Sequence, residues 1–84
     1  MQEFNSVSAP SHYIQGREYE PRKVIQDWDL NFNLGNVVKY ISRAGRKGSA
    51  LQDLEKAQQY LTWEIERIYS EEMVKAYEDF EKGV

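Results

Sequence analysis

The sequence predicts an all-α protein in which two short helices precede one long C-terminal helix. Apolar side chains recur every three or four residues in three successive segments, which is typical of helices that bury one face. Pro21 and Gly45 stand where a helix would begin and end, and neither Pro nor Gly occurs between Ser49 and Lys82. A chain of 84 residues forms one domain with a small core, so burial against further copies is expected.

Residues 1–20 are expected to form an N-terminal arm, and residues 21–84 the helical domain. The arm begins with a stretch that has no periodicity, and Gly16 interrupts its second half. Within the arm, His12 and Tyr13 form an aromatic pair just after a turn signal.

The first helix should start at Pro21, because a proline in the first turn loses no hydrogen bond there. Val24, Ile25 and Trp28 then give a short amphipathic helix of about two turns.

The second helix should have Asn33 as its N-cap and should stop at Gly45. Its hydrogen-bond donors succeed one another at spacings of three and four and therefore share one face: Asn36, Lys39, Arg43 and Arg46. The opposite face is apolar: Val37, Ile41 and Ala44. A helix that packs through its apolar face and presents a row of donors on the other face is suited to binding phosphate or another anion.

The third helix should begin after Ser49, which forms a capping-box pattern with Gln52, and Asp53 suits the positive end of the helix dipole. Apolar residues then recur at spacings of three and four: Leu51, Leu54, Ala57, Leu61, Ile65 and Ile68, then less regularly Tyr69, Met73, Ala76, Tyr77 and Phe80. An unbroken helix would be about 50 Å long, which is more than two short helices can cover. Either the helix breaks near Ser70 or its far end packs on a partner chain, and we expect a homo-oligomer formed through helices.

Composition excludes several classes of protein. The net charge of −3 argues against general binding to DNA or RNA. The absence of cysteine excludes disulfides and thiolate metal sites and fits a reducing compartment. Neither an apolar run of about 20 residues nor a signal-peptide pattern is present. We therefore expect a cytoplasmic protein that does not associate with membranes.

Few residues suit catalysis, and no cofactor is expected. The single histidine, His12, has no Ser or Cys partner at a recognisable spacing, which leaves no hydrolytic triad. Glu64, Glu71 and Glu72 are conceivable metal ligands, but charges on a long helix more often form a solvated face, and no metal is expected. The Gly-Arg-Lys-Gly-Ser run at residues 45–49 comes after a helix and lacks the Walker spacing, although its backbone N–H groups can still face an anion.

Each feature of the candidate anion site also has a purely structural interpretation. The basic face of the second helix would then be its solvent side, Asn36 a buried structural amide, and Tyr40 and Tyr60 core aromatics. Gly35 costs about 1 kcal/mol relative to Ala within a helix, so we expect either another backbone or a ligand to approach it closely.

Three motifs occur in order along the chain: His-Tyr at residues 12–13, Phe-x-x-Gly-Asn-x-x-Lys-Tyr-x-x-Arg at residues 32–43, and Asp-Leu-x-Lys-Ala-x-x-Tyr-Leu at residues 53–61. In this combination the chain resembles a family of small bacteriophage and prophage proteins of unknown function, termed SaV-like or nucleotide kinase-like. The resemblance covers about residues 10–68. A related domain forms part of a coliphage nucleotide kinase that has no Walker loop.

The resemblance implies a nucleotide or another phosphate-bearing ligand. It also implies that the expected cytoplasmic location is the cytoplasm of a bacterial host. The positions that match the family motifs are the expected ligand-binding residues: His12, Tyr13, Asn36, Lys39, Tyr40, Arg43, Lys47, Asp53, Lys56 and Tyr60. In a binding module, such as a sponge that sequesters a nucleotide signal of host defence, Lys39, Arg43 and Lys47 would hold phosphates. Asn36 would contact a polar edge, and Tyr13 or Tyr40 would stack on a base.

Two other classes remain open. In a nucleotide-metabolising enzyme related to nucleoside monophosphate kinases, His12 or Asp53 would transfer a proton while Lys39 and Arg43 stabilise phosphoryl charge. In a non-catalytic phage interaction protein, the long helix would be the interface.

Overall fold

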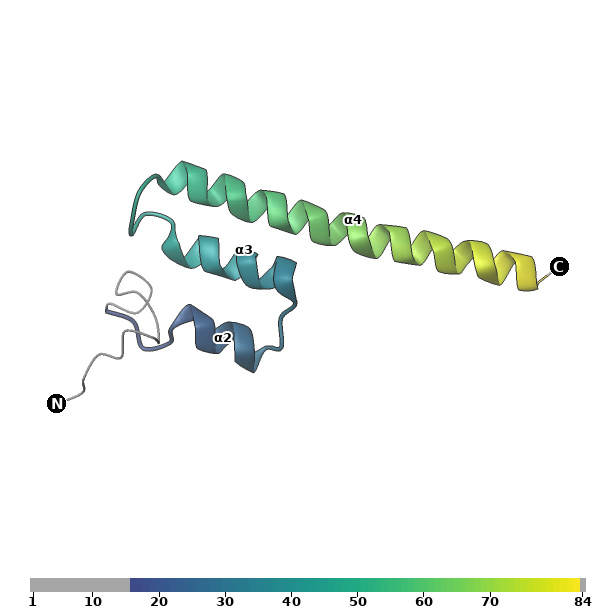
Figure 1. Ribbon diagram of the computed structural model, residues 1–84, viewed down its shortest axis with the longest axis horizontal. Coiled ribbons are helices and arrows are strands. Elements are labelled where there is room, and N and C mark those ends of the chain that lie inside the picture. Colours follow the sequence, from purple (N-terminus) through teal and green to yellow (C-terminus); the bar gives the residue numbers. More distant parts are fainter. Residues whose placement is uncertain (1–15, 84) are drawn as a thin grey trace.

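The computed structural model describes residues 16–83, and all regular secondary structure within them is helical. The elements are α2 (Pro21–Asp27), α3 (Phe32–Arg43) and α4 (Ala50–Lys82). Figure 1 shows α3 lying beside the first half of α4, with α2 on the side of α3 that faces away from α4. The all-α prediction of two short helices and one long one is confirmed, whereas His12, Tyr13 and most of the expected arm lie outside the described residues.

The two short helices begin at identifiable signals. Pro21 occupies the first turn of α2, as predicted, and its side chain is buried. The N-cap of α3 is Asn31, whose side chain accepts a hydrogen bond of 2.9 Å from the Leu34 N–H. The prediction of Asn33 as the N-cap is therefore wrong. Because Asn33 lies in the first turn of α3, its amide is free to reach α4 instead.

The long helix α4 runs without a break from Ala50 to Lys82, so the alternative of a break near Ser70 is excluded. Its N-cap is Ser49, whose hydroxyl accepts from the Gln52 N–H at 3.2 Å, as the capping pattern predicted. At 33 residues α4 is far longer than the 12-residue α3 that packs on it. The second half of α4 consequently projects beyond the other helices (Figure 1).

Gly35 is a position at which α2 packs closely on α3. It is buried, and a Cβ atom placed there would lie 3.2 Å from Cγ2 of Ile25. The close approach that the glycine predicted is therefore made by a side chain of α2. Arg17 adds a second tie on this side, because its guanidinium donates to the carbonyl oxygen of Ser42.

The apolar face expected for α3 is only partly covered, since Val37 and Ala44 are half-buried and Ile41 is exposed. Ile41 is 56% exposed, whereas Tyr40 stacks on Tyr60 of α4 and Arg43 pairs with Asp53 of α4. Part of the face that carries the donors is thus the packing face. The reason is that α4 offers an aromatic ring and a carboxylate at this contact rather than aliphatic side chains.

The three described helices include none that is both long and apolar enough to cross a membrane.

Candidate functional site

The turn between α3 and α4 carries two cations between two glycines. Gly45 and Gly48 have φ values of +83° and +70°, in the left-handed region that glycine adopts without strain. The Arg46 N–H donates to the Arg43 carbonyl oxygen at 2.8 Å, which tightens the end of α3. Arg46 and Lys47 are exposed at this turn. The two glycines therefore present a basic turn next to the N-terminus of α4.

A second group of cations gathers on an aromatic pair just below this turn. The rings of Tyr40 and Tyr60 stack with centroids 6.0 Å apart and an interplanar angle of 13°. Lys39 Nζ lies 4.9 Å from the centroid of the Tyr40 ring, and Lys56 Nζ lies 5.3 Å from it. Within residues 16–83 neither ammonium group forms an ion pair. Two like charges from different helices thus lie close to one ring, whose π-electrons attract cations.

Arg43 and Asp53 form the polar contact between the start of α4 and the end of α3. Arg43 Nε lies 3.4 Å from Asp53 Oδ1, and the Asp53 side chain is only 2% exposed. A carboxylate taken out of water needs a charged partner, so this pair holds the two helices together at the turn. Asp53 also lies in the first turn of α4, where the helix dipole favours a negative charge.

These contacts separate the predicted site residues into groups. Lys39, Tyr40, Lys56 and Tyr60 come together from two helices, Arg43 contacts Asp53, and Lys47 lies on the turn. Asn36 donates to the Phe32 carbonyl oxygen one helical turn earlier, at 2.9 Å. His12 and Tyr13 are outside the described residues.

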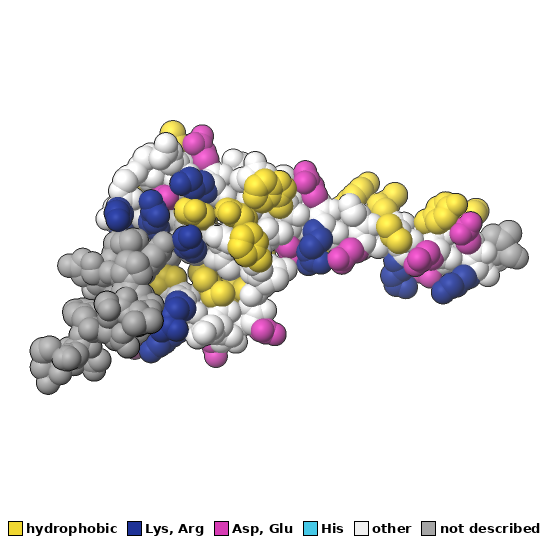
Figure 2. All heavy atoms as spheres, in the orientation of Figure 1, with side chains coloured by type: hydrophobic (Ala, Val, Ile, Leu, Met, Phe, Trp, Pro, Cys, Tyr) yellow, Lys and Arg dark blue, Asp and Glu magenta, His cyan; other side chains and the backbone are white. Residues whose placement is uncertain are grey.

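Figure 2 places this region within the charge distribution of the molecule. On the face shown, Lys and Arg side chains gather at the end where α3 meets α4, while acidic and basic side chains alternate along the projecting part of α4. A chain of net charge −3 therefore has one positive end. An anion approaching the protein would be attracted to that end.

A buried polar cluster that the sequence analysis missed ties the start of α3 to the middle of α4. Glu64 is 4% exposed and accepts hydrogen bonds from Asn31 Nδ2 at 2.9 Å and Asn33 Nδ2 at 3.1 Å. Arg67 also donates two hydrogen bonds to the Glu64 carboxylate, from Nε to Oε1 at 3.1 Å and from Nη2 to Oε2 at 2.7 Å. The hydrogen bonds from Arg67, followed by the one from Asn31, lower the pKa of Glu64 from 4.5 to about 2.

The same cluster engages two of the three carboxylates that the sequence analysis named as conceivable metal ligands. Arg67 lies between two of the three carboxylates, donating to Glu64 and, through Nη1 at 2.7 Å, to Glu71. Both carboxylates raise the pKa of Arg67, which keeps it charged. Among residues 16–83 no group of three or more potential ligands could hold a metal ion. The acidic residues at this position serve to pair an arginine.

Comparison with known proteins identifies a family but no characterised relative. No curated protein and no solved structure matches the chain. The family DUF3310, described as proteins of unknown function, matches residues 7–62. The matched segment includes α2, α3, the basic turn and the Tyr40–Tyr60 pair, and it ends before the projecting half of α4. The chain belongs to the DUF3310 family.

Proposed function

We propose that the end of the molecule around the α3–α4 turn binds a nucleotide or another phosphate-bearing ligand. The observation that carries the proposal is the convergence of Lys39 and Lys56 on the Tyr40 ring, at 4.9 and 5.3 Å from its centroid. Two ammonium groups from different helices near one ring make this surface positive, and a phosphate beside them would be attracted to it. Lysine is a common phosphate ligand because it offers a compact charge with three donors.

The neighbouring groups fit the same ligand class. Lys47 is exposed on the basic turn, and the first N–H groups of α4 lie next to it. Tyr40 and Tyr60 stack on each other, and Phe32 and Trp63 pack edge-to-face with Tyr60, so the two ammonium groups lie beside a fixed aromatic cluster. The resemblance of the three motifs to phage proteins related to a nucleotide kinase favours a nucleotide over other anions. Sequestration of a nucleotide signal of host defence would be one use of such a site.

The contacts of each cation decide which substitution tests the proposal. Arg43→Ala is a poor test because it removes the charged partner of buried Asp53 and would perturb the helix contact itself. Lys56→Ala is better suited, since Lys56 is exposed and its described contact is with the Tyr40 ring. Lys75→Ala is the matched control: it removes the same charge from the same helix, at a site where Lys75 Nζ pairs with Asp79 at 3.3 Å.

The test is isothermal titration calorimetry with inorganic phosphate and with mono-, di-, tri- and cyclic nucleotides. Wild type and Lys75→Ala should bind at least one of these ligands with equal affinity. Lys56→Ala should bind the same ligand about 10-fold more weakly, corresponding to the loss of one charge-assisted contact. The proposal fails if wild type binds none of them, or if Lys56→Ala binds like wild type. Recovery of the ligand unchanged would indicate a binding module, and recovery of a phosphorylated product would indicate a kinase.

A further inference from the structure

One side of α4 carries a continuous series of exposed apolar side chains. This apolar stripe consists of Leu51, Leu54, Leu61, Ile65, Ile68, Tyr69, Met73 and Phe80, whose exposures range from 41% to 74%. The helix packs on α3 through different residues, since Asp53, Ala57 and Glu64 are the side chains of α4 that become buried. The apolar stripe therefore has no cover among residues 16–83.

The stripe is large enough to form an interface. Its exposed surface is on the order of 800 Å², which matches what one partner contributes to a standard interface and exceeds the usual patch on a monomer. Leu51, Leu54, Leu61, Ile65 and Ile68 fall on two positions of a seven-residue repeat, in which Gln58 takes the place of one apolar residue. This repeat lets two helices pack along each other over several turns.

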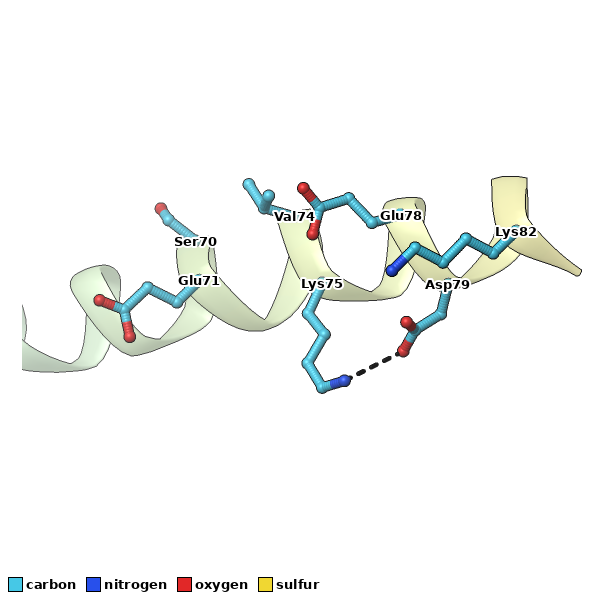
Figure 3. A pocket seen from close by; sticks show the side chains of 7 residues that line it. All are labelled: Ser70, Glu71, Val74, Lys75, Glu78, Asp79 and Lys82. Atoms are coloured by element: carbon cyan, nitrogen blue, oxygen red, sulfur yellow. Dashed lines mark hydrogen bonds and ion pairs between the residues drawn. The ribbon is translucent and has the colours of Figure 1, made fainter.

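The opposite side of α4 also exposes Trp63 and Val74, but as isolated apolar residues rather than as a stripe. A shallow groove beyond the end of α3 is lined mostly by charged side chains, among them Glu71, Glu78 and Lys82, as Figure 3 shows. Lys75 and Asp79, one turn apart on α4, pair with each other at 3.3 Å. Val74 is its apolar member and is 57% exposed. The groove is thus a solvated face, and the apolar stripe is the side of α4 that lacks a partner among the described residues.

The opposite charges at the two ends of the molecule favour a second copy of this chain, aligned antiparallel, as the partner of the stripe. Residues 39–56, at the turn end, carry five cations and two carboxylates, whereas residues 68–83, at the far end, carry five carboxylates and two cations. Two copies aligned in parallel would bring like ends together. Two copies aligned antiparallel would bring the basic end of each against the acidic end of the other, and their helix dipoles would also be opposed.

We propose that the apolar stripe of α4 binds the same stripe of a second copy of this chain in an antiparallel pair. With the twofold axis near Ile65, Leu51 of one copy lies opposite Phe80 of the other, so the stripes of both copies are covered along their full length. The projecting half of each α4 then packs against the hairpin half of its partner. Lys56 does not belong to the stripe.

The first test measures mass by light scattering coupled to size-exclusion chromatography. Wild type should have twice the chain mass of 9.9 kDa. Ile65→Glu should reduce it to a single chain, because it places a charge in the middle of the apolar interface. Val74→Glu is the matched control: Val74 is 57% exposed, close to the 59% of Ile65, and nine residues further along it lies on the opposite side of the same helix.

Three results would overturn the proposal: a wild type with the mass of one chain, an assembly that survives Ile65→Glu, or one that Val74→Glu dissociates equally. Circular dichroism checks that both variants remain helical.

The second test measures whether the two α4 helices run parallel or antiparallel, and it does not depend on the stability of the glutamate variants. Because the sequence has no cysteine, each introduced thiol is the only one in its chain. Under oxidation, a mixture of Leu51→Cys and Phe80→Cys proteins should form a disulfide-linked mixed pair, while neither protein alone should cross-link efficiently. Cross-linking of each variant with itself and not with the other would show a parallel pair and contradict the proposal.

Discussion

Asn31 donates from Nδ2 to Glu64 Oε2 over 2.9 Å while its Oδ1 accepts from the Leu34 N–H, so one amide both caps α3 and ties it to α4. The two functions need different atoms of the same side chain. Aspartate is as good as asparagine at an isolated N-cap, but its carboxylate has no donor to offer Glu64. The identity of residue 31 is thus set by the tertiary contact as much as by the helix start.

Asn31→Asp should therefore destabilise the protein, although it keeps the capping acceptor. The new carboxylate would face buried Glu64 without a donor, and we expect a loss of about 1–2 kcal/mol in the free energy of unfolding. Ser49→Asp, the same residue placed at the N-cap of α4, should be neutral within about 0.5 kcal/mol. Urea unfolding followed by circular dichroism measures both. Equal effects of the two substitutions would show that the contact with Glu64 contributes nothing.

The Arg43–Asp53 pair should behave as a coupled unit. Arg43→Ala and Asp53→Ala should each lower the free energy of unfolding by about 2 kcal/mol, the first by leaving a buried carboxylate without its charged partner. The double variant should lose less than the sum of the two single variants, because no unpaired carboxylate remains. A double-mutant cycle from chemical unfolding measures the coupling. Strictly additive losses would mean that the pair does not join α3 to α4.

Acid should weaken the fold through Glu64. Its pKa is lowered from 4.5 to about 2 in the folded chain, chiefly by the hydrogen bonds from Arg67, so the ionised form is the one that folding favours. The stabilisation is fully present above pH 4.5 and is lost as the pH falls from there towards about 2. Glu64→Gln should lower the melting temperature at neutral pH and flatten its decline below pH 4.5. Exposed Glu66→Gln is the control, and an equal flattening there would contradict the assignment to Glu64.

Local signals made the helices predictable. Pro21, Ser49 and Gly45 act through the backbone of their own or adjacent residues, and the structure confirms each as a helix start or end. The N-cap of α3 was not predictable in this way. Asn31 and Asn33 are both able to cap, and the choice depends on Glu64, more than thirty residues away in sequence.

The buried cluster was missed because a glutamate on a long helix usually faces water. The available signal was the three-residue spacing of Glu64 and Arg67, which allows a pair on one helix face, together with two asparagines before the second helix. Periodicity also identified the apolar stripe of α4 without indicating what covers it. A heptad pattern reports that one side is apolar, and only the placement of α3 shows that this side is left exposed.

The central claim is that the α3–α4 turn end binds a phosphate-bearing ligand, and a nuclear magnetic resonance titration tests it most directly. Adding the tightest-binding nucleotide to ¹⁵N-labelled protein should shift the amide signals of residues 39–60, around Lys39, Lys56 and the basic turn. Signals from residues 70–83 should stay in place, and inorganic phosphate should shift a subset of the same signals more weakly. Shifts confined to other regions, such as the exposed surface around Trp28, or no shifts at all would contradict the claim.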